Sequence, residues 1–160
     1  MSDPKIDAWK PRGAIYIWHY EGFPKNFPGY HLTADQQGCI FLLGLFERFR
    51  GTHYPAHKKF PLLPPTPNHL AIPNCPKAAI PARLAEFRFQ RDFPNDYWSM
   101  SEADGMVAIE TGATGLSALE RGILDILLGK GDWFTGQGNH CLWFWWHPPF
   151  GPGGKDLRIP

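Results

Sequence analysis

Cysteine is scarce in this chain, and long hydrophobic runs are missing. The three cysteines, Cys39, Cys75 and Cys141, are odd in number and have no CxxC spacing. That pattern predicts neither a disulfide framework nor a zinc site, and it favours reduced thiols in a cytoplasmic protein. No stretch approaches the roughly 18 apolar residues that a transmembrane helix requires. Residues 1–7 have no apolar signal-peptide core, so no membrane partner is expected.

An excess of charge of one sign is also missing. Sixteen Lys and Arg residues face 15 Asp and Glu residues, which gives a net charge of +1. Binding to nucleic acid through counterion release requires several clustered cations. The densest basic spot is only Lys58-Lys59 beside His57. Nucleic acid is therefore not the expected partner.

Glycine, proline and aromatic residues are abundant instead. The chain has 17 Gly, 17 Pro, seven Trp, five Tyr and 12 Phe among 160 residues. This composition predicts long irregular connections around an aromatic-rich core. The length is typical of one domain, so we expect residues 1–160 to form a single α+β domain. Within it, residues 1–12 are predicted to be a loose arm and residues 151–160 a tail.

Two amphipathic helices are the clearest local predictions. In the first, Thr33 is the expected N-cap, Gln36 is its capping-box partner, and Gly51 ends the helix. The second begins near Thr114 and ends before Gly129. Alternating or β-branched and aromatic residues predict strands over 14–20, 84–89, 106–110 and 141–147, with residues 97–100 as an optional short strand or edge.

A proline-rich segment, residues 52–83, separates the two halves of the chain. Its eight prolines argue against a helix or a central strand. We expect it to wrap over the surface in extended form, because its scattered leucines and isoleucines require burial.

The predicted order of elements is β-α-(long loop)-β-β-α-β. Two helices packed on a four-stranded, mainly antiparallel sheet satisfy this order, as in a ferredoxin-like fold. The ending, with Gly129-Lys130-Gly131-Asp132-Trp133 followed by Leu142-Trp143-Phe144-Trp145-Trp146, resembles that of small uncharacterised bacterial proteins. The resemblance covers less than a fifth of the chain and implies no functional residues.

Candidate catalytic residues are few. His53 and His57 have the i, i+4 spacing of metal ligands on a helix, but Pro55 lies between them, so loop histidines are the favoured interpretation. Glu102, in a predicted turn with Asp104, could act as an acid or base only inside a cleft. The glycine-rich stretch 129–138 follows a helix, whereas a phosphate-binding loop precedes one. No metal or cofactor is therefore expected.

The aromatic residues form the most distinctive candidate site. If the first and last strands are neighbours, Tyr16, Trp18, Trp143 and Trp145 share one face of the sheet, and Trp133 lies in the hinge before the last strand. Such a face could bind a protein, a sugar or stacked bases if it is exposed. The competing interpretation is that helices or the proline-rich segment cover it as core.

Three functions are compatible with these features. The favoured one is a non-catalytic protein-interaction module, in the manner of an inhibitor or an immunity-type antidote to another protein. The first alternative is a small hydrolase-like enzyme with a cleft beside residues 52–83 that uses His53, His57 or Glu102. The second alternative is binding of single-stranded nucleic acid or sugar through the sheet aromatics.

Overall fold

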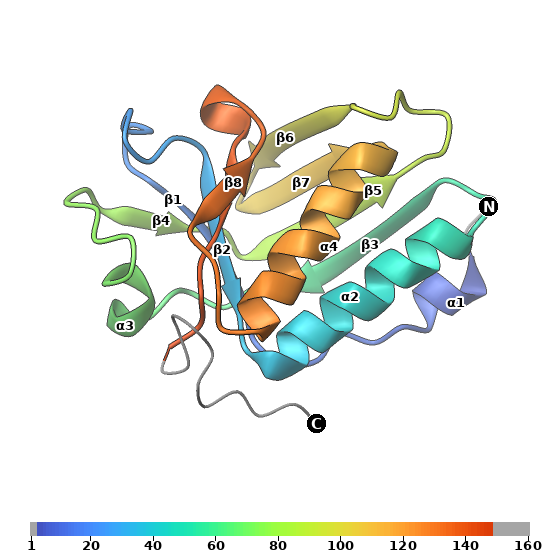
Figure 1. The fold of residues 1–160 in the computed structure, drawn as a ribbon, viewed down its shortest axis with the longest axis horizontal. Helices are drawn as coiled ribbons and strands as arrows, with labels where there is room; N and C mark the ends of the chain where they lie inside the picture. The colour runs from blue at the N-terminus through green and yellow to red at the C-terminus, as the bar shows by residue number, and fades with distance from the viewer. Residues whose placement is uncertain (1–2, 149–160) are drawn as a thin grey trace.

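A computed structural model describes residues 3–148. These residues form an α+β fold with two β-sheets, and the two long helices lie side by side across it (Figure 1). None of the helices in this range is long and apolar enough to cross a membrane. In chain order the elements are α1 (Pro4–Asp7), β1 (Ile15–Tyr20), β2 (Tyr30–Ala34), α2 (Gln36–Gly51), β3 (Ala56–Pro61), α3 (Pro67–Leu70), β4 (Ala79–Pro81), β5 (Leu84–Phe89), β6 (Trp98–Ala103), β7 (Met106–Thr111), α4 (Ala113–Leu127), β8 (Trp133–Thr135), the 3₁₀ turn η1 (Gly138–His140) and β9 (Leu142–Phe144).

Both sheets are mixed. The five-stranded sheet has the order β4-β1-β2-β9-β8, in which only β2 and β9 are parallel. The four-stranded sheet has the order β3-β5-β7-β6, in which only β5 and β7 are parallel. The chain passes from the first sheet to the second between β2 and β3 and again between β4 and β5, where the Ala82 amide donates to the Ile17 carbonyl at 2.9 Å.

This topology corrects the predicted single sheet. The α+β class is confirmed, but within residues 3–148 there are nine strands in two sheets rather than four in one. The ferredoxin-like layout is not the one found. Pairings such as β2 with β9 join segments more than 100 residues apart, and local periodicity carries no information about them.

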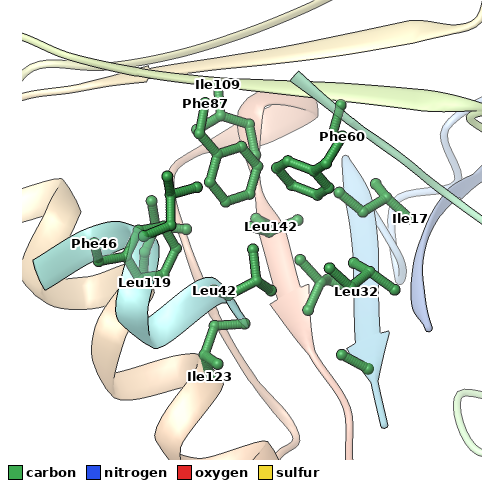
Figure 2. Close-up of a cluster of buried hydrophobic side chains, with 14 of the residues drawn as sticks. Ile17, Leu32, Leu42, Phe46, Phe60, Phe87, Ile109, Leu119, Ile123 and Leu142 are labelled. Atoms are coloured by element: carbon green, nitrogen blue, oxygen red, sulfur yellow. The ribbon is translucent and has the colours of Figure 1, made fainter. Parts of the chain in front are cut away.

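One hydrophobic core fills the space between the two helices and the inner faces of both sheets (Figure 2). Leu42 and Phe46 of α2 and Leu119 and Ile123 of α4 point into it. The Phe46 ring stacks on Phe87 of β5 with centroids 5.7 Å apart. The predicted helical stripes therefore face the sheets as expected for amphipathic helices.

The first long helix begins two residues later than predicted. Asp35 is the N-cap, and its carboxylate accepts from the Gly38 amide at 2.8 Å. Thr33, the predicted cap, lies instead in β2, which was missed. All five residues of β2 are buried because the strand lies between β1 and β9, so it lacks the alternation of a half-exposed strand.

The proline-rich segment is more regular than predicted. It contains β3 and β4, which are both edge strands and therefore tolerate the terminal prolines Pro61 and Pro81. The prediction that it contains no helix needs correction, because α3 is a single helical turn. Pro67 occupies the start of that turn, where proline needs no amide hydrogen bond.

Residues 3–12 of the N-terminal arm pack against the rest of the fold, whereas residues 1–12 were predicted to be a loose arm. Ile6 of α1 is buried, and the Trp9 indole donates to the Phe41 carbonyl at 2.9 Å. The Arg48 guanidinium lies 3.6 Å from the centre of the Trp9 ring, which gives a cation–π contact. The predicted 151–160 tail lies outside the described residues.

The last strand is shorter than predicted but central to the core. The prediction covered 141–147, whereas β9 spans only Leu142–Phe144. Leu142 and Phe144 are fully buried on the helix side of the sheet. The pairing of this segment with β2 ends at the hydrogen bond from the Trp145 amide to the Leu32 carbonyl.

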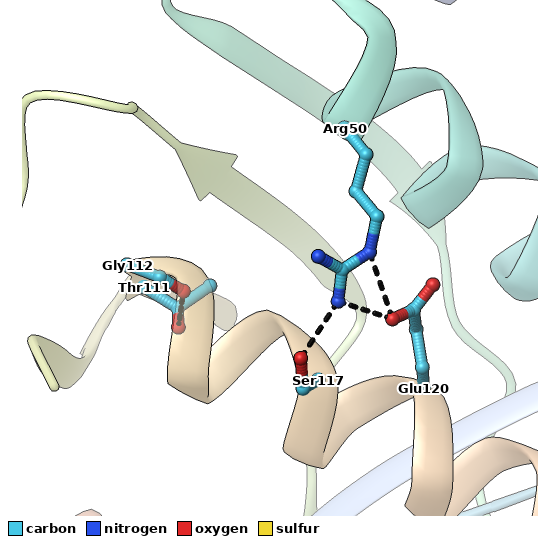
Figure 3. Close-up of polar contacts among 5 residues, drawn as sticks. All are labelled: Arg50, Thr111, Gly112, Ser117 and Glu120. Carbon is cyan, nitrogen blue, oxygen red and sulfur yellow. Dashed lines mark hydrogen bonds and ion pairs between the residues drawn. The ribbon is translucent and has the colours of Figure 1, made fainter. Parts of the chain in front are cut away.

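The outer sides of α2 and α4 are joined by a polar clamp (Figure 3). Arg50 donates to Ser117 Oγ at 2.8 Å and forms an ion pair with Glu120. The Arg50 and Glu120 side chains are 40% and 31% exposed, so water screens the pair. We expect Arg50→Ala to lower the free energy of unfolding by no more than about 1 kcal/mol, measured by urea denaturation. A loss several times larger would contradict the described exposure.

Candidate functional site

The four-stranded sheet carries its helices on one face and exposes polar side chains on the other. Along β5, Phe87 enters the core while its neighbour Arg88 points to the opposite side. We call this opposite side the open face. Its members are His57, Lys59, Pro61, Leu84, Glu86, Arg88, Ser99, Ser101, Ala103, Met106, Ala108 and Glu110.

A buried carboxylate lies at the centre of the open face. The Glu86 side chain is only 5% exposed, which is rare for an acid unless it is paired. The Arg88 guanidinium donates to Glu86 Oε1, with Nε at 2.8 Å, and its other arm lies 3.7 Å from Glu110. His57 Nδ1 lies 3.4 Å from Glu86 Oε2. The Glu86 carboxylate raises the pKa of Arg88, so the arginine remains charged.

The strand register aligns these groups into a row. His57 faces Arg88, Arg88 faces Glu110, and Glu110 faces Ser99, so the row crosses all four strands. Lys59 lies next to this row, opposite Glu86, and is exposed. The row therefore presents the Arg88 cation beside the Glu110 carboxylate, and the ion pairs of Arg88 with Glu86 and Glu110 hold this arrangement before any partner binds.

A second polar cluster joins the two sheets. Glu102 lies in β6 rather than in the predicted turn. Its carboxylate accepts from the Tyr30 hydroxyl at 2.9 Å, and His19 Nε2 lies 3.4 Å from the same oxygen. Burial, followed by the hydrogen bond to Glu102, raises the pKa of Tyr30. Phe23 stacks on the other side of the imidazole with centroids 4.5 Å apart. The cluster ties the sheets together.

The remaining catalytic candidates do not converge. His53 is exposed in the turn after α2, whereas His57 lies on β3 beside Glu86. They share no helix, so their i, i+4 spacing does not bring them to one point. Within residues 3–148 no group of three His, Cys, Asp or Glu side chains is placed to hold a metal ion.

Four of the five predicted aromatic residues do share one face of the five-stranded sheet. Tyr16, Trp18 and Trp145 belong to one buried cluster, and Trp143 packs against it. The first and last strands are not neighbours, however, because β2 lies between them and inserts His31. The His31 ring stacks on Trp18 and Trp143 at 5.7 and 6.1 Å.

Trp133 is separate from this face. It lies on β8, is half-buried, and packs against the main core with its ring 4.9 Å from that of Phe144, measured between centroids. Its indole donates to the Asp125 carboxylate of α4 at 2.9 Å. The structure therefore gives Trp133 a contact with α4, and it does not join the other four aromatics.

The aromatic face is covered. Residues 64–78, which we call the strap, lie over it, and Leu70, Ile72 and Cys75 pack on the cluster. Trp18 is 0% exposed and Trp145 is 7% exposed, so a ligand cannot stack on either indole while the strap is in place. The covered arrangement matches the interpretation of these residues as core.

A surface hollow of about 530 Å³ lies between the first turns of α4 and the η1 turn. Trp98 forms one wall, and Asp96, Gln137 and His140 line the rim. His140 Nδ1 accepts from the Met100 amide at 3.1 Å, which orients the ring at the rim. The volume suits a small molecule, although nothing in the sequence had singled out this hollow.

No protein-family model matches the chain, and no curated protein or solved structure shows significant similarity to it. The function is therefore inferred from the geometry of the described residues.

Proposed function

We propose that this chain is a non-catalytic protein-interaction module that binds a protein partner through the open face. The observation that carries the proposal is the Glu86–Arg88 pair, because it places a buried carboxylate in the middle of a solvent-facing sheet. Removing a carboxylate from water is costly unless a cation and hydrogen bonds compensate.

The pair supports partner binding because it fixes an arginine in advance. Arg88 is held by Glu86 and Glu110, yet its side chain remains 42% exposed. Arginine is enriched among residues that dominate binding energy at protein interfaces, and a side chain ordered beforehand loses less entropy on binding. A partner carboxylate between Lys59 and Arg88, and a partner cation near Glu110, would complete the charge pattern.

The area of the open face is smaller than the area that a stable protein complex buries on each partner. Strands about 4.8 Å apart and about 20 Å long give a four-stranded face of roughly 400 Å², half of the ~800 Å² per partner of a stable complex. The partner must therefore extend beyond the sheet, over the rim formed by β3 and β6. An inhibitor or antidote acts in this way, by occupying a surface of its target rather than by chemistry of its own.

Two substitutions at exposed positions test the proposal and leave the Glu86 and Arg88 side chains themselves in place. Ser101 and Lys59 are exposed on the open face, so Ser101→Arg adds bulk there and Lys59→Glu reverses a charge. Gln37→Arg on α2 and Lys130→Glu after α4 are matched controls at exposed positions. The tagged wild-type chain is used to capture its partner from the host, and the affinity of that partner is then measured for every variant.

We expect both open-face variants to weaken the complex at least tenfold, which corresponds to about 1.4 kcal/mol, while the controls bind like the wild type. Equal binding by all five proteins, or loss of binding in the controls alone, would contradict the proposal.

A further inference from the structure

The strap covers the aromatic face of the five-stranded sheet but is not part of its ladder. We propose that the strap is a releasable cover, which lifts in mild acid and exposes the aromatic face while both sheets and the long helices remain folded. This inference concerns the other sheet and does not depend on the proposed function.

The attachment of the strap explains how it can lift. Its ends are fixed, because the Leu63 amide donates to the Ile15 carbonyl and β4 pairs with β1. The Glu21 amide also donates to the Ala78 carbonyl at the C-terminal end of the strap. Over residues 64–77, the backbone hydrogen bonds stay within the strap, from Leu70, Ala71, Ile72 and Asn74 to Thr66, Pro67, His69 and Leu70. Side chains hold this part of the strap to the sheet, and an isolated helical turn such as α3 has little stability of its own.

His69 is the central side-chain anchor. It is 5% exposed, and its ring lies 4.2 Å from Tyr16 and 5.0 Å from His147, measured between centroids. Its Nδ1 accepts from the Thr66 amide at 2.9 Å. The imidazole therefore helps to shape α3 and also attaches it to β1.

The covered state leaves polar atoms unsatisfied. Thr33 Oγ1, opposite Tyr16 in the ladder, and His147 Nδ1 are buried without a hydrogen-bond partner among the described residues. Each such group loses its hydrogen bonds to water when it is covered. Lifting the strap would let water reach this face, and this gain partly offsets the loss of apolar contacts.

The covered state disfavours protonation of His69. Burial, followed by the proximity of His147, lowers the pKa of His69 to about 4. Burial also lowers the pKa of His147, and Asp35 opposes that shift. The other ionisable side chains at this face are His31, whose pKa burial lowers to about 3, Tyr16 and Tyr20, whose pKa values burial raises, and Cys75. The Asp35 carboxylate already accepts from the amides of Ala14 and Gly38.

The direction in which pH shifts strap opening follows from the pKa of His69 in the covered and released states. A released His69 regains its ordinary pKa of about 6.5, so below that pH the open state binds a proton that the covered state excludes. The ratio of open to covered molecules should therefore rise about tenfold per pH unit between pH 6.5 and about 4, and more steeply if His147 is released as well.

Hydrogen exchange measured by mass spectrometry tests this directly. Protection factors, which are corrected for the intrinsic pH dependence of exchange, are compared from pH 7.5 to pH 5 for strap amides and for amides of β5 and β7. We expect the protection of strap amides to fall about tenfold per unit below pH 6.5 while that of β5 and β7 is retained. A parallel fall in both regions, or no fall in the strap, would overturn the proposal.

The variant His69→Asn assigns the effect to the imidazole. Asparagine keeps an acceptor for the Thr66 amide but does not titrate. Below pH 6.5 its strap protection should fall about tenfold less per pH unit than that of the wild type, whatever its level at pH 7.5. A variant that keeps the full wild-type dependence would show that another group drives the opening. His53→Asn, at an exposed position, is the matched control and should behave like the wild type.

Discussion

Between pH 7.5 and pH 4.5 the free energy of unfolding should fall by about 2.7 kcal/mol because of His31 alone. The His31 ring is 0% exposed, and its Nδ1 accepts from the Trp145 indole at 2.9 Å. Burial lowers its pKa to about 3, whereas the unfolded chain protonates near 6.5. Each pH unit below that value therefore favours the unfolded state by about 1.4 kcal/mol. The loss is a large part of a typical total of about 5–15 kcal/mol.

Urea denaturation at several pH values measures this slope. His31→Asn keeps an acceptor for the Trp145 indole but cannot titrate, so its slope should be smaller by about 1.4 kcal/mol per pH unit. The rings around His31 come from the sheet and from Phe27, not from the strap, so this effect is separate from strap release. His53→Asn should leave the slope unchanged. Equal slopes for wild type and His31→Asn would show that His31 is not excluded from protonation.

Gly122→Ala should destabilise the protein by about 2 kcal/mol, although alanine is normally the better helix former. A Cβ at Gly122 would lie 2.4 Å from the Phe144 ring carbons, and Phe144 is fully buried. Overpacking of a core costs about 1–3 kcal/mol, more than the ~1 kcal/mol gained in helix propensity. For a chain of this size the expected fall in melting temperature is about 4–8 °C.

Gly51→Ala is the matched control, because Gly51 ends α2 and a Cβ there meets no atom within 4 Å. Calorimetry should show a melting temperature equal to or above that of the wild type. A neutral or stabilising effect of Gly122→Ala would contradict the close packing of α4 on β9.

Much of the fold could be predicted from local patterns. The strands at Ile15–Tyr20 and Leu84–Phe89 and both long helices follow from periodicity, because each presents one apolar face to the core. Tyr30–Ala34 was missed because its polar His31 and Thr33 point into a second buried cluster. The resulting pattern of apolar and polar residues resembled a loop followed by a helix cap.

The candidate site was less predictable than the fold. In the sequence, Glu86 and Arg88 indicate only the solvent-exposed side of a strand. The register of β5 with β3 and β7 is needed to show that they lie beside His57 and Glu110. The shared face of Trp143 and Trp145 followed from strand parity. The strap that covers it could not be placed, because its contacts depend on packing between distant segments.

Site-specific photocrosslinking in the host tests the central claim most directly. A photoreactive phenylalanine analogue is placed at Ser101 on the open face and, separately, at Gln37 on α2, which are both exposed. The account predicts that position 101 crosslinks to one defined protein, that position 37 does not, and that Lys59→Glu abolishes the product. Crosslinking to that same protein from position 37 with none from position 101 would contradict it.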